Sequence, residues 1–149
     1  MTYTYKYPRM LVTVDAVIFL KDDDSTYKIL LIKRKNPPYK GKYALPGGFP
    51  ETDELLMDAA IRELDEETGL KMNELEQLAA FDAVDRDPRD RNISIAYYGL
   101  TSPKNAKLNA GDDAAEAHWI PLNNLPELAF DHKEVIELAA RRLQIKLCS

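Results

Sequence analysis

Residues 45–70, LPGGFPETDELLMDAAIRELDEETGL, decide the fold and the chemistry of this chain. The stretch begins with Gly47 and Gly48, and glycine allows a backbone to approach other groups closely. It continues as an apolar-periodic segment of good helix formers and ends at Gly69, a typical left-handed helix stop. The pattern predicts a helix from about Asp53 to Thr68, with acidic residues in its first turn, where the helix dipole favours them.

Three carboxylates of this predicted helix share one arc. At about 100° per residue, Glu63, Glu66 and Glu67 fall within roughly 100° of one another. Two of them share the apolar face that carries Leu56 and Leu64, which should pack against the core. Carboxylates held together at the edge of a core repel one another and lose hydration, so they need a counter-charge.

The available counter-charges indicate the kind of site. Arg62 can pair with Glu66 one helical turn away, but one arginine cannot neutralise three acids. Oxygen ligands at this density suit Mg²⁺ or Mn²⁺. We therefore interpret Glu63, Glu66 and Glu67 as ligands of a hard metal ion.

The spacing of these residues resembles a known family signature. Gly48, five residues, Glu54, seven residues and then RELDEETGL at 62–70 match the Nudix box at every defining position. A pattern of this length with several fixed residues is highly specific. The resemblance implies a hydrolase of nucleoside diphosphates linked to another group, working with Mg²⁺ or Mn²⁺. It also implies an α/β fold, an α/β/α sandwich with a mixed β-sheet in which the box forms a loop-helix-loop.

The same resemblance implies roles for residues around the acidic arc. The carbonyl of Gly48 would join the metal shell; the alternative is that the glycine only forms a turn. Glu54 would sit in a non-helical loop and fold back to support the site; the alternative is a charge favoured by the helix N-terminus. Arg62 would orient a carboxylate.

The general base is left open between two residues. We expect Glu66 and Glu67 to act as metal ligands, which leaves Glu63 or Glu116 as the base. Glu116 and Asp113 belong to a second acidic stretch, and Nudix enzymes often recruit an acid from outside the box as a ligand or base. A solvated loop leading into a strand is the alternative interpretation of that stretch.

Basic residues outside the box supply hypotheses for substrate binding. The loop DRDPRDRN at 85–92 is either a solvated connection with self-paired charges or a phosphate-binding loop, because the forked guanidinium matches phosphate oxygens. Arg34 or Lys42, just before the box, is a further candidate for contact with phosphate. The predicted substrate-binding residues are Arg34, Arg86, Arg89 and Arg91.

A similarity outside the box narrows the choice of substrate. The segments VDAVIF, LLIKR, DRDPRDR and GDDAAEAHW together look similar to the Nudix branch assigned as ADP-ribose pyrophosphatases. They are also similar to the sensor domain of transcriptional regulators of NAD metabolism. The first similarity implies hydrolysis of ADP-ribose to AMP and ribose 5-phosphate. The rival hypotheses are clean-up of oxidised nucleoside triphosphates and a non-catalytic metabolite sensor. The intact box argues against the sensor, as does the lack of room after the last helix for a DNA-binding domain.

The remaining sequence predicts the elements around the box. A last helix should open after Phe130 and run down to Leu147, with Asp131 as N-cap and Glu134 completing a capping box. Residues 11–20 and 27–32 should form an antiparallel pair. Further strands are expected at 43–46, 75–84, 93–98 and 117–120.

Length, composition and charge limit the classes to which the protein can belong. With 149 residues, 45% hydrophobic and 30% charged, residues 1–149 are expected to form one soluble domain. No apolar run reaches membrane-spanning length, no signal peptide is evident, and the single Cys148 suggests a reducing cytoplasm. A net charge of −5 without a long basic run argues against nucleic acid as a partner. The expected partner is a small-molecule nucleotide, and the N-terminal tyrosines are compatible with a homodimer.

Overall fold

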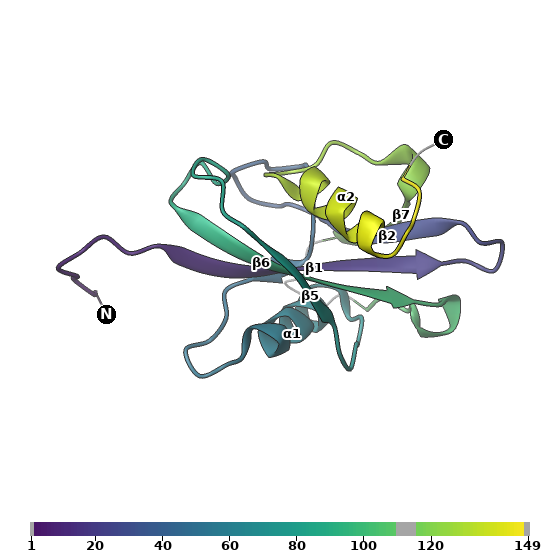
Figure 1. Cartoon of the computed structure of the whole chain (residues 1–149), viewed down its shortest axis with the longest axis horizontal. Helices are drawn as coiled ribbons and strands as arrows, with labels where there is room; N and C mark the ends of the chain where they lie inside the picture. The colour runs from purple at the N-terminus through teal and green to yellow at the C-terminus, as the bar shows by residue number, and fades with distance from the viewer. Residues whose placement is uncertain (1, 110–115, 148–149) are drawn as a thin grey trace.

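A mixed β-sheet lies between helices α1 and α2 in the computed structural model, which describes residues 2–109 and 116–147 (Figure 1). The strands are β1 Leu11–Lys21, β2 Tyr27–Lys33, β3 Tyr43–Ala44, β4 Gly47–Gly48, β5 Glu76–Phe81, β6 Asn92–Thr101 and β7 Glu116–Pro121. The helices are α1 Leu56–Thr68 and α2 His132–Arg142, with 3-10 turns η1 Pro103–Asn105 and η2 Leu122–Asn124. Within the described ranges, no helix is long and apolar enough to cross a bilayer.

Strand β1 is the centre of the sheet. It pairs in parallel with β6 and antiparallel with β2 and β4, and the main path is β3-β2-β1-β6-β5. Strand β7 adds to β2. The predicted antiparallel pair of residues 11–20 and 27–32 is therefore confirmed, as is the mixed sheet.

The alternation of side chains along β1 builds a core on each face of the sheet. Val14 and Ile18 pack with Leu64 of α1, whereas Phe19 packs with Val135 of α2. Since successive side chains of a strand point to opposite faces, α1 and α2 cover opposite sides (Figure 1). This arrangement is the predicted α/β/α sandwich.

Helix α1 begins at Leu56 rather than at Asp53. The preceding residues form a turn in which the Glu54 carboxylate accepts a hydrogen bond from the Glu51 N–H at 3.0 Å. Glu54 thus lies in a loop that folds back, as predicted. Gly69 ends the helix in the left-handed region, with φ of 78°, as its position indicated.

Helix α2 differs more from its prediction. The capping box at Asp131 does not form, because both carboxylate oxygens accept hydrogen bonds from Arg86, at 2.9 and 2.7 Å. The helix ends at Arg142, not at Leu147, and Gln144 has a φ of 57° that a helix cannot continue through.

Two predicted strands are also corrected. The strand expected at 43–46 is confined to Tyr43–Ala44, β3, and the glycine pair after it forms the separate strand β4. Between them, Pro46 has no N–H to donate, and its carbonyl accepts from the Ala16 N–H. The strand expected at 75–84 is confined to Glu76–Phe81, since the carbonyl of Asp82 already accepts from the Arg91 side chain.

Candidate active site

Helix α1 presents two glutamates to the glycine pair of β4. The Gly47 N–H donates a hydrogen bond to Oε1 of Glu67 at 3.0 Å. Gly48 lies so close to Glu63 that a Cβ added to it would sit 2.6 Å from the carboxyl carbon of that residue. At Gly47 an added Cβ would lie 2.1 Å from the carbonyl oxygen of Val14, so both positions need a backbone without a side chain. The third carboxylate of the arc, Glu66, is exposed.

Arg62 donates hydrogen bonds to three carboxylates, those of Glu54, Glu63 and Glu66. Its Nε and Nη2 donate to both oxygens of Glu54, at 2.7 and 2.9 Å. Its Nη1 donates to Glu63 at 3.0 Å and to Glu66 at 3.2 Å, while Nη2 also donates to the Phe49 carbonyl at 3.1 Å. The predicted pair with Glu66 is confirmed, and the guanidinium is shared among three acids.

Of the three carboxylates in the arc, Glu67 is the one that Arg62 does not contact. Burial raises the pKa of Glu67 to about 8. The hydrogen bond from the Gly47 N–H lowers this pKa, and the neighbouring Glu63 raises it. Burial also raises the pKa of Glu63, although Arg62 opposes it. By contrast, the Arg62 guanidinium holds the pKa of Glu54 at about 2. The glutamate nearest the glycines therefore lacks the positive charge that its ionised form requires.

The donor set fits a hard divalent cation. The carboxylates of Glu63, Glu66 and Glu67 and the carbonyl of Gly48 offer oxygen only, which suits Mg²⁺ or Mn²⁺. In the described part of the chain, no three histidine, cysteine, aspartate or glutamate side chains are arranged so that together they could hold a metal ion. Arg62 accounts for this, because it holds Glu63 and Glu66.

A cationic edge borders the glutamates. The guanidinium carbon of Arg34 lies 5.0 Å from the centre of the Phe130 ring, and that of Arg89 lies 5.7 Å from the same ring. Arg89 is paired with Asp87, whereas Arg34 donates to the carbonyl of Pro38 and has no carboxylate partner among the described residues. Burial and the neighbouring Arg89 lower the pKa of Arg34, which indicates a cation in need of an anion.

The two other predicted substrate-binding arginines are placed differently. The Arg86 side chain is only 3% exposed, because it is buried in an ion pair with Asp131. This ion pair ties its loop to the start of α2, and the role of Arg86 in substrate binding stays a prediction. Arg91 is half-buried and its Nη1 donates to the Asp82 carbonyl at 2.8 Å, which ties it to its own loop.

Among the described residues, Glu116 and Lys42 form no hydrogen bond or ion pair with the glutamates of the box. Glu116 begins β7, opposite Lys33 of β2, and its side chain is exposed. Asp113 lies outside the described residues. Lys42 forms an ion pair with Glu127.

Two residues near the site were missed from the sequence. Asp15 lies opposite Gly47 in the β1–β4 pair and accepts a short hydrogen bond from the Ser94 hydroxyl. His132 accepts a hydrogen bond from the Leu45 N–H through Nδ1, at 3.0 Å. A signal existed for Asp15, because it is the only charged residue of the predicted strand at 11–20 and a buried charge needs partners. No local pattern singled out His132.

Comparison with known proteins decides the family. A model described as a NUDIX domain matches residues 11–139. The chain belongs to the Nudix family. It is 48% identical over 126 residues to an ADP-ribose pyrophosphatase of Methanocaldococcus jannaschii, covering 85% of this chain and 70% of that protein. It is also 39% identical over 144 residues to an ADPR responsive transcriptional repressor, NtrR, of Acinetobacter baylyi, covering 94% of this chain but only 57% of the repressor.

Solved structures agree with the family. The NUDIX domain of Shewanella oneidensis NrtR complexed with ADP ribose superposes with a TM-score of 0.85 at 35% identity, covering 95% of this chain and 94% of that one. A bifunctional NMN adenylyltransferase/ADP ribose pyrophosphatase of Francisella tularensis, complexed with AMP and a Mn ion, gives 0.79 at 33% identity, covering 93% and 43%. The Nudix fold and the class of Nudix pyrophosphohydrolase expected from the box are confirmed.

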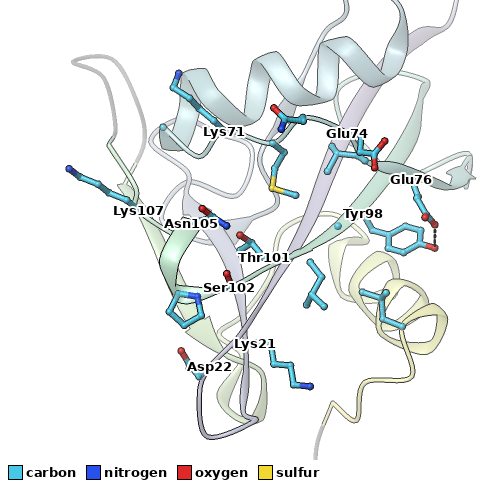
Figure 2. Close-up of a pocket in the computed structure, with 18 of the residues that line it drawn as sticks. Lys21, Asp22, Lys71, Glu74, Glu76, Tyr98, Thr101, Ser102, Asn105 and Lys107 are labelled. Atoms are coloured by element: carbon cyan, nitrogen blue, oxygen red, sulfur yellow. Dashed lines mark hydrogen bonds between the residues drawn. The ribbon is translucent and has the colours of Figure 1, made fainter.

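A broad recess elsewhere on this Nudix protein lacks the chemistry of the box. It lies where β1 and β6 end and is lined by Lys21, Tyr98, Thr101 and the segment after α1 (Figure 2). The Tyr98 hydroxyl donates to Glu76, and Lys71 pairs with Asp65. Because its lining charges are largely exposed or paired, we place the active site at the glycine pair instead.

Proposed function

We propose that this Nudix protein hydrolyses ADP-ribose to AMP and ribose 5-phosphate in the cytoplasm, as a single domain spanning residues 1–149. One observation carries the proposal: the buried carboxylate of Glu67, which has no cation partner among the described residues, interacts electrostatically with Arg34, a cation that has no carboxylate partner among them. An acidic cluster next to an unpaired guanidinium suits a substrate that is itself anionic but arrives with divalent metal. The identity to the pyrophosphatase of M. jannaschii supports ADP-ribose as the substrate.

The cofactor we propose is Mg²⁺, with Mn²⁺ as the alternative, held by Gly48, Glu63, Glu66 and Glu67. When bound, the metal supplies charge neutralisation on phosphoryl oxygens and lowers the pKa of a water molecule.

The chain's own residues prepare this site. The Gly47 N–H fixes one oxygen of Glu67, and Arg62 positions Glu63 and Glu66 while it is anchored on Glu54. Arg62 is therefore a positioning residue that keeps like charges together. Holding the acids in place before the substrate arrives avoids a reorganisation cost during the reaction.

We assign the general base to Glu63, provided that its carboxylate is not fully committed to the metal, with Glu116 as the alternative. Glu63 is largely shielded from solvent and lies against Gly48, so it is close to the reacting centre that we propose. Burial raises the pKa of Glu63, which brings a carboxylate nearer to the range in which it can accept a proton at neutral pH. Glu116 would have to act from the exposed start of β7.

Replacing Arg34 by Gln should raise KM for ADP-ribose by about tenfold or more while changing kcat less, because a guanidinium–phosphate pair is lost. Steady-state kinetics across substrate concentrations measures both constants. The matched control is Lys35→Gln, which removes the same charge from the exposed neighbouring residue. Equal KM values for the two variants would exclude Arg34 from the substrate site.

A substrate panel tests the proposed activity. The protein is incubated with Mg²⁺ and ADP-ribose, NAD-type dinucleotides, or normal and oxidised deoxynucleoside triphosphates, and the products are identified. AMP and ribose 5-phosphate from ADP-ribose are expected. Release of pyrophosphate from the triphosphates alone would favour the clean-up function. Binding of ADP-ribose without hydrolysis would favour a sensor, the role suggested by the similarity to the ADPR responsive repressor.

We also propose a homodimer. Tyr3, Tyr5 and Tyr7 are 68%, 49% and 70% exposed on an N-terminal segment that projects from the body of the molecule (Figure 1). Exposed aromatic side chains gathered in one segment favour burial against a partner. Sedimentation at several protein concentrations distinguishes a dimer from a monomer.

A further inference from the structure

A buried polar group lies on the face of the sheet that is opposite to the glutamate helix. Asp15 has the same parity along β1 as Val17 and Phe19, which pack with α2 (Figure 1). His132, the first residue of α2, is buried, and its Nε2 lies 3.7 Å from Oδ2 of Asp15. The proposed chemistry uses neither side chain directly.

His132 makes one hydrogen bond that reaches the active-site segment. Its Nδ1 accepts the Leu45 N–H at 3.0 Å, so the ring proton resides on Nε2, the nitrogen that faces Asp15. Burial lowers the pKa of His132, although Asp15 and Asp131 oppose this. The lowered pKa keeps the ring in the neutral form, which is the form able to accept this hydrogen bond.

The segment that His132 holds leads directly to Glu67. Leu45 is followed by Pro46, whose carbonyl accepts from the Ala16 N–H at 2.8 Å, and then by Gly47, whose N–H donates to Glu67. The flanking strands β3 and β4 contain only two residues each, so the strand ladder alone holds this segment weakly. The hydrogen bond to His132 fixes its first residue.

An apolar side chain could fill the space of the imidazole, but it could not replace the acceptor. Leu45 is only 2% exposed, so its N–H would be left without a partner and away from water. A buried donor without an acceptor is costly, and the backbone would move to relieve it. That movement would be transmitted to Gly47, two residues along the chain.

We propose that His132 is a positioning residue for the active site: by accepting the Leu45 N–H from the far face of the sheet, it sets the place of Gly47 and so the orientation of Glu67. Helix α2 thereby supports a site that is built on α1. The kinetic part of this inference rests on the proposed function of Glu67, whereas the hydrogen bond can be tested without any activity.

Three variants of His132 separate the acceptor from the bulk of the ring. His132→Asn places an oxygen at the position of Nδ1, His132→Gln places its polar atoms near Nε2, and His132→Leu has no acceptor. We expect the Leu and Gln variants to lose kcat by about 10- to 100-fold with KM changed less than about threefold, because a small misplacement of a reacting group is expensive. The Asn variant should recover kcat to within about threefold of the parent chain.

A control and an independent readout complete the test. Val135→Ala, also in buried α2, should lower stability without lowering kcat. Amide hydrogen exchange, measured without metal or substrate, should be faster at Leu45 and Gly47 in the Gln variant than in the Asn variant. This comparison stays decisive if the Leu variant does not fold, and also if the parent chain hydrolyses no substrate.

Two results would overturn the role of His132. One is a folded Gln or Leu variant with the kcat of the parent chain. The other is an Asn variant that loses as much kcat as the Gln variant, or that shows the same exchange rates at Leu45 and Gly47. A parent chain without hydrolytic activity would contradict the proposed function and leave the exchange comparison to decide whether His132 positions the segment.

Discussion

Replacing Glu67 by Gln should reduce kcat by about 10³-fold and leave the protein folded. The amide keeps the size of the side chain but cannot carry the negative charge that would bind a metal ion next to the glycine pair. Burial and Glu63 already raise the pKa of Glu67 there. Steady-state hydrolysis of ADP-ribose at saturating Mg²⁺ and circular dichroism measure the two properties. Asp65→Asn is the matched control, because Asp65 lies on the same helix and pairs with Lys71 away from the acidic arc. A near-normal rate in the Glu67 variant would remove Glu67 from the site.

The same variant should change how stability depends on pH when metal is absent. The folded protein holds the proton of Glu67 up to a pKa of about 8, whereas the ordinary glutamate pKa is 4.5. Between these values the folded state binds more protons, so its stability falls as pH rises. Thermal melts in a chelator should therefore show Tm decreasing from pH 5 to pH 8. In Glu67→Gln this decrease should be smaller, and the variant should melt several degrees higher at pH 8. If Tm fell equally with pH in both proteins, the raised pKa of Glu67 would be contradicted.

Replacing Arg86 by Met should cost about 3–5 kcal/mol of the free energy of unfolding, the range for breaking a buried ion pair from one side. The Asp131 carboxylate would lose both of its charge-assisted hydrogen bonds and remain buried without a cation. Urea unfolding measures the loss. Arg91→Met, in the same loop and bonded only to backbone carbonyls, should cost about 0.5 kcal/mol or less.

A second change distinguishes a structural arginine from one that binds substrate. The double variant Arg86→Met with Asp131→Leu should recover most of the lost stability, because an apolar pair can replace a buried ion pair. Its KM for ADP-ribose should stay close to that of the parent chain. A stable Arg86→Met protein with a strongly raised KM would instead support the prediction that Arg86 binds substrate.

The part of the site that could be predicted from the sequence is local in the chain. One helix carries Glu63, Glu66 and Glu67, so its periodicity alone places them on one arc, and the apolar stripe shows which edge faces the core. The helix end could be predicted as well, because the residue after the last turn adopts a left-handed conformation, which glycine accepts easily, and Gly69 stands there. Glu54 shows the limit of this approach, because the helix was expected to begin at about Asp53 and only the family pattern indicated that Glu54 folds back.

What could not be predicted depends on partners distant in sequence. Asp131 looked like a helix cap, yet its carboxylate is taken by Arg86, 45 positions away. Asp15 is held by Ser94, 79 positions away, and His132 meets Leu45 across 87 positions. Local spacing rules do not see such pairs, because the sheet order and the packing of α2 create them. The same limit explains why Arg86 and Arg89, in one loop, were not separable before the fold was known.

Metal binding by the parent chain and by Glu67→Gln is the most direct test of the central claim, that crowded carboxylates on one helix edge require a divalent cation. Mn²⁺ can be titrated into each protein in the presence of a non-hydrolysable ADP-ribose analogue, and bound metal read by electron paramagnetic resonance. The parent chain should bind Mn²⁺ in competition with Mg²⁺, and the Glu67 variant should bind it at least about tenfold more weakly. No Mn²⁺ bound by the parent chain, or equal affinity in both proteins, would contradict the account.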